Sequence, residues 1–159
     1  MTRRPFLAVL SAFGFAPKLA VAQGAPAGPK IEPLKLADAE WKKRLTPQQY
    51  DVLRKDGTEY PGSSPLNAEK HKGTFHCVGC ELALFSSDTK FESGTGWPSF
   101  FTSLPGAVLT KTDLKMIIPR TEYHCARCEG HQGHIFDDGP KPTGKRYCNN
   151  GVALKFIAT

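Results

Sequence analysis

The chain has 159 residues, of which 40% are hydrophobic and 23% are charged, with 10 phenylalanines, 4 tyrosines and 2 tryptophans. This is ordinary globular usage, and the length suits one domain with a short appendage. The formal net charge of +6 falls to about +3 without the three basic residues of the first 22, because 18 basic residues then face 15 acidic ones. No basic run stands out, so we expect no nucleic-acid partner.

Residues 1–22 have the pattern of an export signal. The segment begins with Arg3 and Arg4, continues with an apolar stretch over residues 6–16, and ends in a small-x-small cleavage site at 20–22. The apolar stretch is too short to span a bilayer, so we expect no stable membrane insertion. The arginine pair resembles a twin-arginine signal, with an ordinary secretory signal as the alternative. Either signal predicts an exported protein, located in the bacterial periplasm.

Residues 23–33 are rich in glycine, proline and alanine and predict a flexible linker, followed by one domain over residues 34–159. Two short helices are predicted at the start of that domain, over about 38–45 and 47–56. Thr46 begins a pattern that combines an N-cap, a proline at the first helical position and a capping-box glutamine. The glycine that follows the second helix suits its C-terminal end.

The rest of the chain predicts a mainly β fold, with antiparallel sheets that form a compact sandwich or barrel-like domain. Glycine and proline recur every few residues, with short aromatic or β-branched runs between them. The runs are GTFHC (73–77), ALFSS (83–87), AVLT (107–110), KMII (115–118), RTEYHC (120–125), HIF (134–136), KRYC (145–148) and VALKF (152–156).

Two Cys-x-x-Cys pairs, Cys77 with Cys80 and Cys125 with Cys128, each follow a strand-like run. Two such turns supply the four soft ligands of a tetrahedral Zn²⁺ site. Four sulfurs leave no open coordination position, so the zinc is expected to be structural and His76 or His124 is not needed as a ligand. Two disulfides are the alternative in an exported protein, and a thioredoxin-type redox pair would need a βαβ setting that the sequence lacks.

The fifth cysteine, Cys148, is the candidate nucleophile. Nearby positive charge lowers the pKa of a thiol, and Arg146 shares a strand face with Cys148, as does Asn150. His131 and His134, in GHQGHIF, could act as a proton donor and an orienting group near a thiolate. Taken alone, such a histidine pair is more often structural or metal-binding.

The loop SGTGWPSF, over residues 93–100, is the third element of the candidate site. Its glycines and proline permit a tight backbone around Trp97. A tryptophan in such a loop is usually a satellite of the core. It can also form the apolar wall of a small pocket that accepts a methyl group.

Taken together, these motifs resemble the B-type peptide methionine sulfoxide reductases. The resemblance covers about residues 36–156, nearly the whole mature chain, and it depends on the order of several segments. These are EWKKRLTPQQYDVLRKDGTE, CVGC, LFSSDTKFESGTGWPSF, RTEYHCARC and GHQGHIFDDGPKPTGKRYCNNGVALKF. Enzymes that reduce methionine sulfoxide each act on one sulfoxide epimer.

The resemblance implies an antiparallel β fold with a four-cysteine zinc site and the reduction of methionine-R-sulfoxide, in proteins or free. It implies that Cys148 attacks the sulfoxide sulfur and becomes a sulfenic acid. Of the two matching histidines, we rank His131 ahead of His134 for the proton role. Asn150, Arg146 and Asp138 match family residues that bind or orient the substrate and its catalytic water. Trp97 matches the wall that receives the ε-methyl group.

The chain departs from the family pattern at several positions. Thr95 stands where many relatives have a second, resolving cysteine, so we expect an external thiol, either small or on a thioredoxin-like protein, to reduce the sulfenic acid. Gln132, Asp137 and Asn149 are polar where more apolar residues are expected, which we interpret as tolerated variation that bears on substrate preference. We expect a monomer. An exported zinc-ribbon binding module and a thiol–disulfide oxidoreductase are the competing functions.

Overall fold

The computed structural model describes residues 31–159, so the predicted export signal and most of the predicted linker lie outside the described residues. Two α-helices precede nine strands that carry most of the regular structure. The elements are α1 (Asp38–Arg44), α2 (Pro47–Lys55), β1 (Gly73–Cys77), β2 (Ala83–Ser86), β3 (Lys90–Phe91), β4 (Ser99–Phe100), β5 (Val108–Asp113), β6 (Arg120–Cys125), β7 (His131–Phe136), β8 (Arg146–Asn149) and β9 (Leu154–Ala158), with short 3₁₀ turns η1 (Pro65–Asn67), η2 (Ser87–Thr89) and η3 (Gly151–Ala153). Within the described part, no helix has the length and apolar character needed to cross a membrane.

Both predicted helices form, and each ends one residue earlier than predicted. The capping box is present, because the Thr46 side chain accepts from Gln49 N and the Gln49 side chain accepts from Thr46 N. The end of α2 differs in detail from the prediction. Asp56, and not Gly57, has the left-handed backbone, at φ 55°. The N–H groups of Asp56 and Gly57 both donate to the Asp51 carbonyl, which closes the helix.

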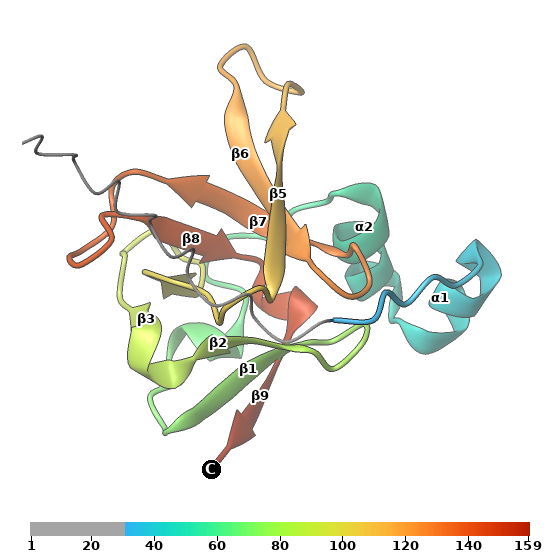
Figure 1. The fold of residues 1–159 in the computed structure, drawn as a ribbon, viewed down its shortest axis with the longest axis horizontal. Helices are drawn as coiled ribbons and strands as arrows, with labels where there is room; N and C mark the ends of the chain where they lie inside the picture. The colour runs from blue at the N-terminus through green and yellow to red at the C-terminus, as the bar shows by residue number, and fades with distance from the viewer. Residues whose placement is uncertain (1–30) are drawn as a thin grey trace, which may run out of the picture.

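The strands form two antiparallel sheets, which confirms the predicted mainly β fold (Figure 1). One sheet has the order β2-β1-β9, and the other has the order β3-β4-β8-β7-β6-β5. Aromatic rings from the two sheets meet in the core. Phe85 of β2 stacks on Phe100 of β4 with ring centroids 4.2 Å apart, and Phe75 of β1 contacts Phe100 edge-on at 4.9 Å. This shared core fixes the six-stranded sheet, which carries the candidate nucleophile.

The runs GTFHC and RTEYHC form β1 and β6 with the predicted bounds, whereas KMII is not a strand. β5 and β6 pair in register up to Asp113 opposite Arg120, so the residues between them form the connection at the tip of a projecting hairpin (Figure 1). Leu114 and Ile117 are exposed there. Composition alone predicted a strand, but the pairing of the flanking strands leaves KMII no partner.

Candidate active site and metal centre

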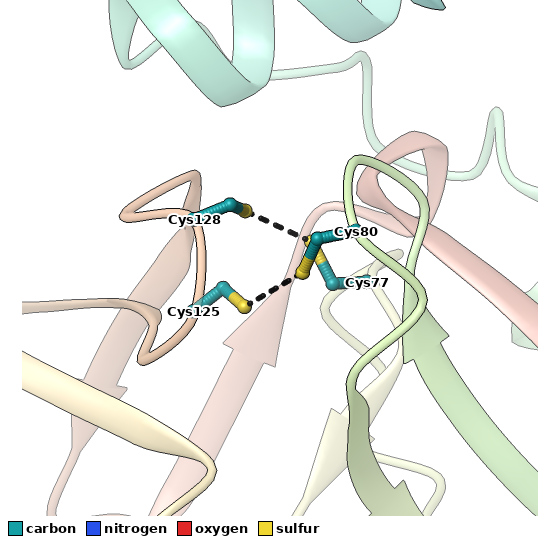
Figure 2. A group of neighbouring side chains, drawn as sticks. All are labelled: Cys77, Cys80, Cys125 and Cys128. Atoms are coloured by element: carbon teal, nitrogen blue, oxygen red, sulfur yellow. Dashed lines mark hydrogen bonds between the residues drawn. The ribbon is translucent and has the colours of Figure 1, made fainter. Parts of the chain in front are cut away.

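Four cysteines from two distant turns meet at one point (Figure 2). The Sγ atoms of Cys77 and Cys128 are 3.6 Å apart, those of Cys80 and Cys125 are 3.4 Å apart, and all four lie within 4.8 Å of one another. A disulfide needs about 2.05 Å, whereas sulfurs about 2.3 Å from a tetrahedral ion lie about 3.8 Å from each other. The cluster therefore fits a metal ion of the soft kind that thiolates select.

The two cysteine turns are built alike. Each pair is followed by a glutamate with a left-handed backbone, Glu81 at φ 62° and Glu129 at φ 58°. The glutamate N–H donates back to the carbonyl of the first cysteine in its turn, at 2.7 Å in the first turn and 2.9 Å in the second. These bonds close both turns so that the thiols of each pair face the same point. Neither His76 nor His124 belongs to the cluster, as expected for a site filled by four thiols.

Cys148 lies on β8 between two strands that bring polar side chains to it. Its Cα partners are His134 on β7 and Ser99 on β4. Directly opposed residues of antiparallel strands present their side chains to the same face. β7 comes close because Gly133 has no side chain, and a Cβ there would lie 1.9 Å from the Cys148 carbonyl oxygen.

The half-buried Cys148 thiol opens into a pocket of about 130 Å³. The lining residues are Thr58, Trp97, Arg120, Gly133, His134, Phe136, Cys148, Asn149 and Asn150. Trp97 and Phe136 supply apolar walls, while His134 and Arg120 supply polar groups. A pocket of this kind can receive an apolar group and a polar oxygen of one small ligand at the same time.

Opposing influences act on the Cys148 thiol. Burial raises the pKa of Cys148, because it disfavours the thiolate. The positive charge of Arg146 and hydrogen bonds from Thr95 and Arg146 oppose this rise, while the negative charge of Asp138 adds to it. The sequence-based expectation that Arg146 favours the thiolate is therefore confirmed in direction, and burial outweighs it.

A β-bulge sets the relative placement of the two histidines. Successive residues of β6 pair with Gly133 and His131, so Gln132 is the extra residue on β7. In a regular strand, residues three apart point to opposite faces, and one extra residue restores them to the same side. The rings of His131 and His134 accordingly lie 5.5 Å apart, centroid to centroid.

His134 is the histidine that lines the pocket. Its Nε2 lies 2.8 Å from the buried carboxylate of Asp113, which also accepts from Arg120 at 2.6 Å and from Lys115 N at 2.9 Å. Burial lowers the pKa of His134, and the bond to Asp113 opposes this effect. The bonds from Lys115 N and His134 hold the pKa of Asp113 well below its usual range. Asp113 thus stays charged and orients both the imidazole and the Arg120 guanidinium.

His131 is buried behind His134 and does not line the pocket. Its Nδ1 lies 2.9 Å from Glu122 Oε1, and the other Glu122 oxygen lies 2.9 Å from Lys111 Nζ. Asp56, Glu122 and His131 lie close enough together to hold an ion. The ammonium groups of Lys111 and Lys115 already contact the two carboxylates, at 2.9 Å from Glu122 and 2.9 Å from Asp56. The two lysines therefore neutralise the carboxylates of this cluster, one of which bonds to His131.

Arg146 and Asp138 form a bidentate pair, with Nε and Nη2 each 2.8 Å from a carboxylate oxygen. The Arg146 guanidinium also covers the ring of Phe136, 4.4 Å from its centroid. Neither Arg146 nor Asp138 lines the Cys148 pocket. Both line a neighbouring hollow together with Thr95, so Arg146 interacts with Cys148 without lining the pocket.

Asn150 and Trp97 line the pocket and are held from behind by Glu59. The Asn150 amide accepts from Glu59 N at 3.0 Å and donates to the Gln132 carbonyl at 3.0 Å. Trp97 Nε1 donates to the Glu59 carbonyl at 3.2 Å. The buried Glu59 carboxylate also accepts from the first two N–H groups of η3. β8 ends before Asn150, so this side chain acts from the start of η3 and not from the strand.

Comparison with known proteins agrees with this geometry. The model of the SelR domain family matches residues 45–158. The chain is 54% identical over 121 residues to a peptide methionine sulfoxide reductase MsrB of Methanosarcina barkeri, which covers 76% of this chain and 85% of that protein. Relatives with the same name from Leptospira interrogans and Agrobacterium fabrum are each 50% identical over 76% of this chain, and the match spans 92% and 90% of their lengths. The chain belongs to the SelR family of B-type methionine sulfoxide reductases.

Sequence reasoning missed several residues of this methionine sulfoxide reductase site. Asp113 and Glu122 orient the histidines and Arg120 lines the pocket, but these residues lie on β5 and β6, before the histidine motif in the chain. Only the alignment of β5, β6 and β7 brings them to the imidazoles. Thr58 and Glu59 fall within the resembling segment, yet nothing in their local pattern indicates contact with Asn150 or Trp97. The one available signal was a charged residue inside a predicted strand, because a charge that becomes buried needs a partner. Glu122 in RTEYHC is such a residue.

Proposed function

We propose that this protein reduces methionine-R-sulfoxide, in proteins and free, with Cys148 as the nucleophile. The observation that carries the proposal is a half-buried Cys148 that lines one pocket together with Trp97 and His134. The indole accepts the methyl group of the sulfoxide, and the polar side accepts its oxygen. A pocket with an apolar wall and a polar wall discriminates between the two epimers, because only one places both substituents correctly.

The reaction begins when the Cys148 thiolate attacks the sulfoxide sulfur. The oxygen gains one proton and passes to the Cys148 sulfur as the sulfur–oxygen bond and the new sulfur–sulfur bond break. Cys148 becomes a sulfenic acid, and methionine leaves as a thioether. The methionine sulfur gains two electrons and the cysteine sulfur loses two. Since burial raises the pKa of Cys148, the nearby Arg146 charge is needed to keep part of the thiol ionised.

His134 is better placed than His131 to donate the proton, although we ranked His131 first from the sequence. His134 lines the pocket, opposite Cys148 across the β7–β8 ladder. His131 is buried and bonded to Glu122, so its proposed role is to support the neighbouring imidazole. A positioned acid typically contributes about 10²–10⁴-fold in rate. Asn150 from the pocket, and Arg146 and Asp138 from the neighbouring hollow, are proposed to orient the substrate and its catalytic water.

External thiols complete the cycle in this proposal. Thr95 occupies the position at which many relatives have a resolving cysteine, and its hydroxyl interacts with Cys148. The other four cysteines form the buried cluster. One external thiol therefore displaces water from the sulfenic acid to give a mixed disulfide, and a second thiol releases Cys148. A small thiol and a thioredoxin-like protein are the candidate reductants.

The cysteine cluster is proposed to hold a structural zinc ion. Four thiolates so close together repel one another unless a cation neutralises them, and a filled set of four sulfurs leaves no open position for substrate. When bound, the ion would hold the ends of β1 and β6 together, with no chemical role in sulfoxide reduction. Export through a signal over residues 1–22, a linker to residue 33 and a periplasmic, monomeric domain complete the proposal.

An epimer-resolved assay tests the proposed function. The wild-type protein with excess dithiol should convert methionine-R-sulfoxide and leave the S epimer, and Cys148→Ser should show no turnover. Without reductant, the wild type should release one methionine per protein and then stop. Metal content and circular dichroism of Cys148→Ser should match the wild type. Substantial residual turnover by Cys148→Ser, or preference for the S epimer, would contradict the proposal.

A further inference from the structure

Two fully buried amides, Gln132 on β7 and Asn149 on β8, connect the cysteine cluster to the strand of the nucleophile. Both stand at positions where apolar residues are expected. Gln132 Nε2 donates to Cys77 Sγ at 3.4 Å, and Asn149 Nδ2 donates to Gln132 Oε1 at 3.4 Å. The buried Tyr123 hydroxyl donates to Asn149 Oδ1 at 2.6 Å. The two polar departures from the family pattern are thus partners of each other.

The surroundings fix which end of each amide faces which neighbour. Asn149 Nδ2 also donates to the Asn150 carbonyl at 2.8 Å, and a carbonyl accepts only from the NH₂ end. That NH₂ group therefore meets the oxygen of Gln132, which turns the Gln132 NH₂ towards Cys77 Sγ. The Tyr123 hydroxyl donates to Asn149 Oδ1, which agrees with this orientation of the Asn149 amide. Reversing one amide would set like groups against each other.

We propose that Gln132 is a positioning residue for the metal centre, and that Asn149 holds it with its N–H directed at the Cys77 sulfur. A thiolate bound to a metal keeps negative charge and accepts hydrogen bonds, and a bond to an ionised acceptor is stronger than a neutral one. The other contact of Gln132 Nε2, to the Gly130 carbonyl, is longer at 3.5 Å. The Gln132 N–H is therefore directed at the Cys77 thiolate and helps to keep it bound to the metal, as hydrogen bonds to metal-bound residues commonly do.

The same bridge, Gln132 with Asn149, reaches the nucleophile. Asn149 directly follows Cys148, and its N–H donates to the Pro98 carbonyl at 2.9 Å. The Gln132 carbonyl accepts from Asn150 N at 2.8 Å and from the Asn150 side chain at 3.0 Å. A continuous set of hydrogen bonds therefore runs from Cys77 to both residues that follow Cys148. The proposal concerns metal retention and does not depend on the reaction at Cys148.

Zinc release from the full-length, zinc-loaded protein to a chromophoric chelator tests the proposal. Gln132→Leu removes the donor, and Gln132→Glu keeps the side-chain shape but places a carboxylate beside the thiolate. Loss of a bond to a metal ligand typically weakens metal affinity about 10–100-fold. We expect the loss in Gln132→Leu to appear as zinc release faster by about the same factor than in the wild type, and Gln132→Glu to release zinc faster still. Release from Gln132→Leu at the wild-type rate would overturn the proposal.

Two further variants distinguish the effect of the bridge on zinc release from the effect of a general loss of stability. Leu84→Ala opens a cavity at a fully buried position on β2 without removing any hydrogen bond of the bridge, and it should release zinc more slowly than Gln132→Leu. Asn149→Leu should speed release only while Gln132 is present, so Gln132→Leu/Asn149→Leu should match Gln132→Leu. The double variant leaves the buried Tyr123 hydroxyl without its acceptor, so Tyr123→Phe is added to it if either single variant folds poorly. Equal release from Leu84→Ala and Gln132→Leu, or a full Asn149 effect without Gln132, would contradict the assignment.

Discussion

Removal of the metal from the cysteine cluster should strongly destabilise the fold. The ion would cross-link cysteines that are 51 and 45 residues apart in the sequence. A cross-link that closes a loop of about 50 residues lowers the chain entropy of the unfolded state, which raises its free energy by about 4 kcal/mol at 25 °C if the estimate for disulfides is applied. The free energy of unfolding of a typical domain is only about 5–15 kcal/mol. For a domain of this size, the loss corresponds to a fall in melting temperature of roughly 10–20 °C.

Thermal unfolding measured by circular dichroism checks this estimate on zinc-loaded and chelator-treated protein. Cys128→Ser, which removes one ligand, should unfold near the temperature of the metal-free protein. Cys148→Ser should unfold with the zinc-loaded wild type, because its thiol lies outside the cluster. A difference of less than about 4 °C between the zinc-loaded and metal-free proteins would refute the reasoning, since that shift corresponds to only about 1 kcal/mol.

Two further predictions concern the active site. Glu122→Gln keeps a hydrogen-bond acceptor for His131 but removes its charge, so kcat should fall by about 10-fold or more with an unchanged KM, and steady-state kinetics on the R epimer measures both. Arg146→Leu removes the charge that opposes the burial effect, so the pKa of Cys148 should rise further. Alkylation of Cys148 by iodoacetamide should then slow at pH 7 and recover at higher pH; an unchanged pH profile would show that Arg146 does not act on the thiol.

The elements that sequence predicted best are those with strong local signals. Thr46 and Gln49 form the capping box that begins α2, and β1 and β6 have the predicted bounds. The two cysteine turns meet as their spacing predicted, because a Cys-x-x-Cys turn specifies its own geometry. By contrast, KMII has the composition of a strand but no strand to pair with. Composition describes a residue's local preference, whereas pairing depends on the rest of the sheet.

The internal arrangement of the candidate site was less predictable. The sequence motifs predicted that Cys148, Trp97 and His134 belong to one site, and all three line the same pocket. It could not show that His131 is buried against Glu122, since that contact depends on the register between β6 and β7. A hydrogen bond between side chains on different strands leaves no trace in either local pattern. Register is set by the whole sheet and by its irregularities.

The bulge at Gln132 connects the histidines of the active site with the cysteine cluster. As the extra residue of β7, it brings His131 and His134 to one side of the strand. The same residue sends its own side chain into the core, towards Cys77. A leucine at this position would preserve the bulge, because the bulge depends on backbone pairing, and it would remove the donor to the thiolate together with the acceptor of Asn149 Nδ2. Placement of the histidines and retention of the metal are therefore separable at one residue, and Gln132→Leu should impair the second while leaving the first intact.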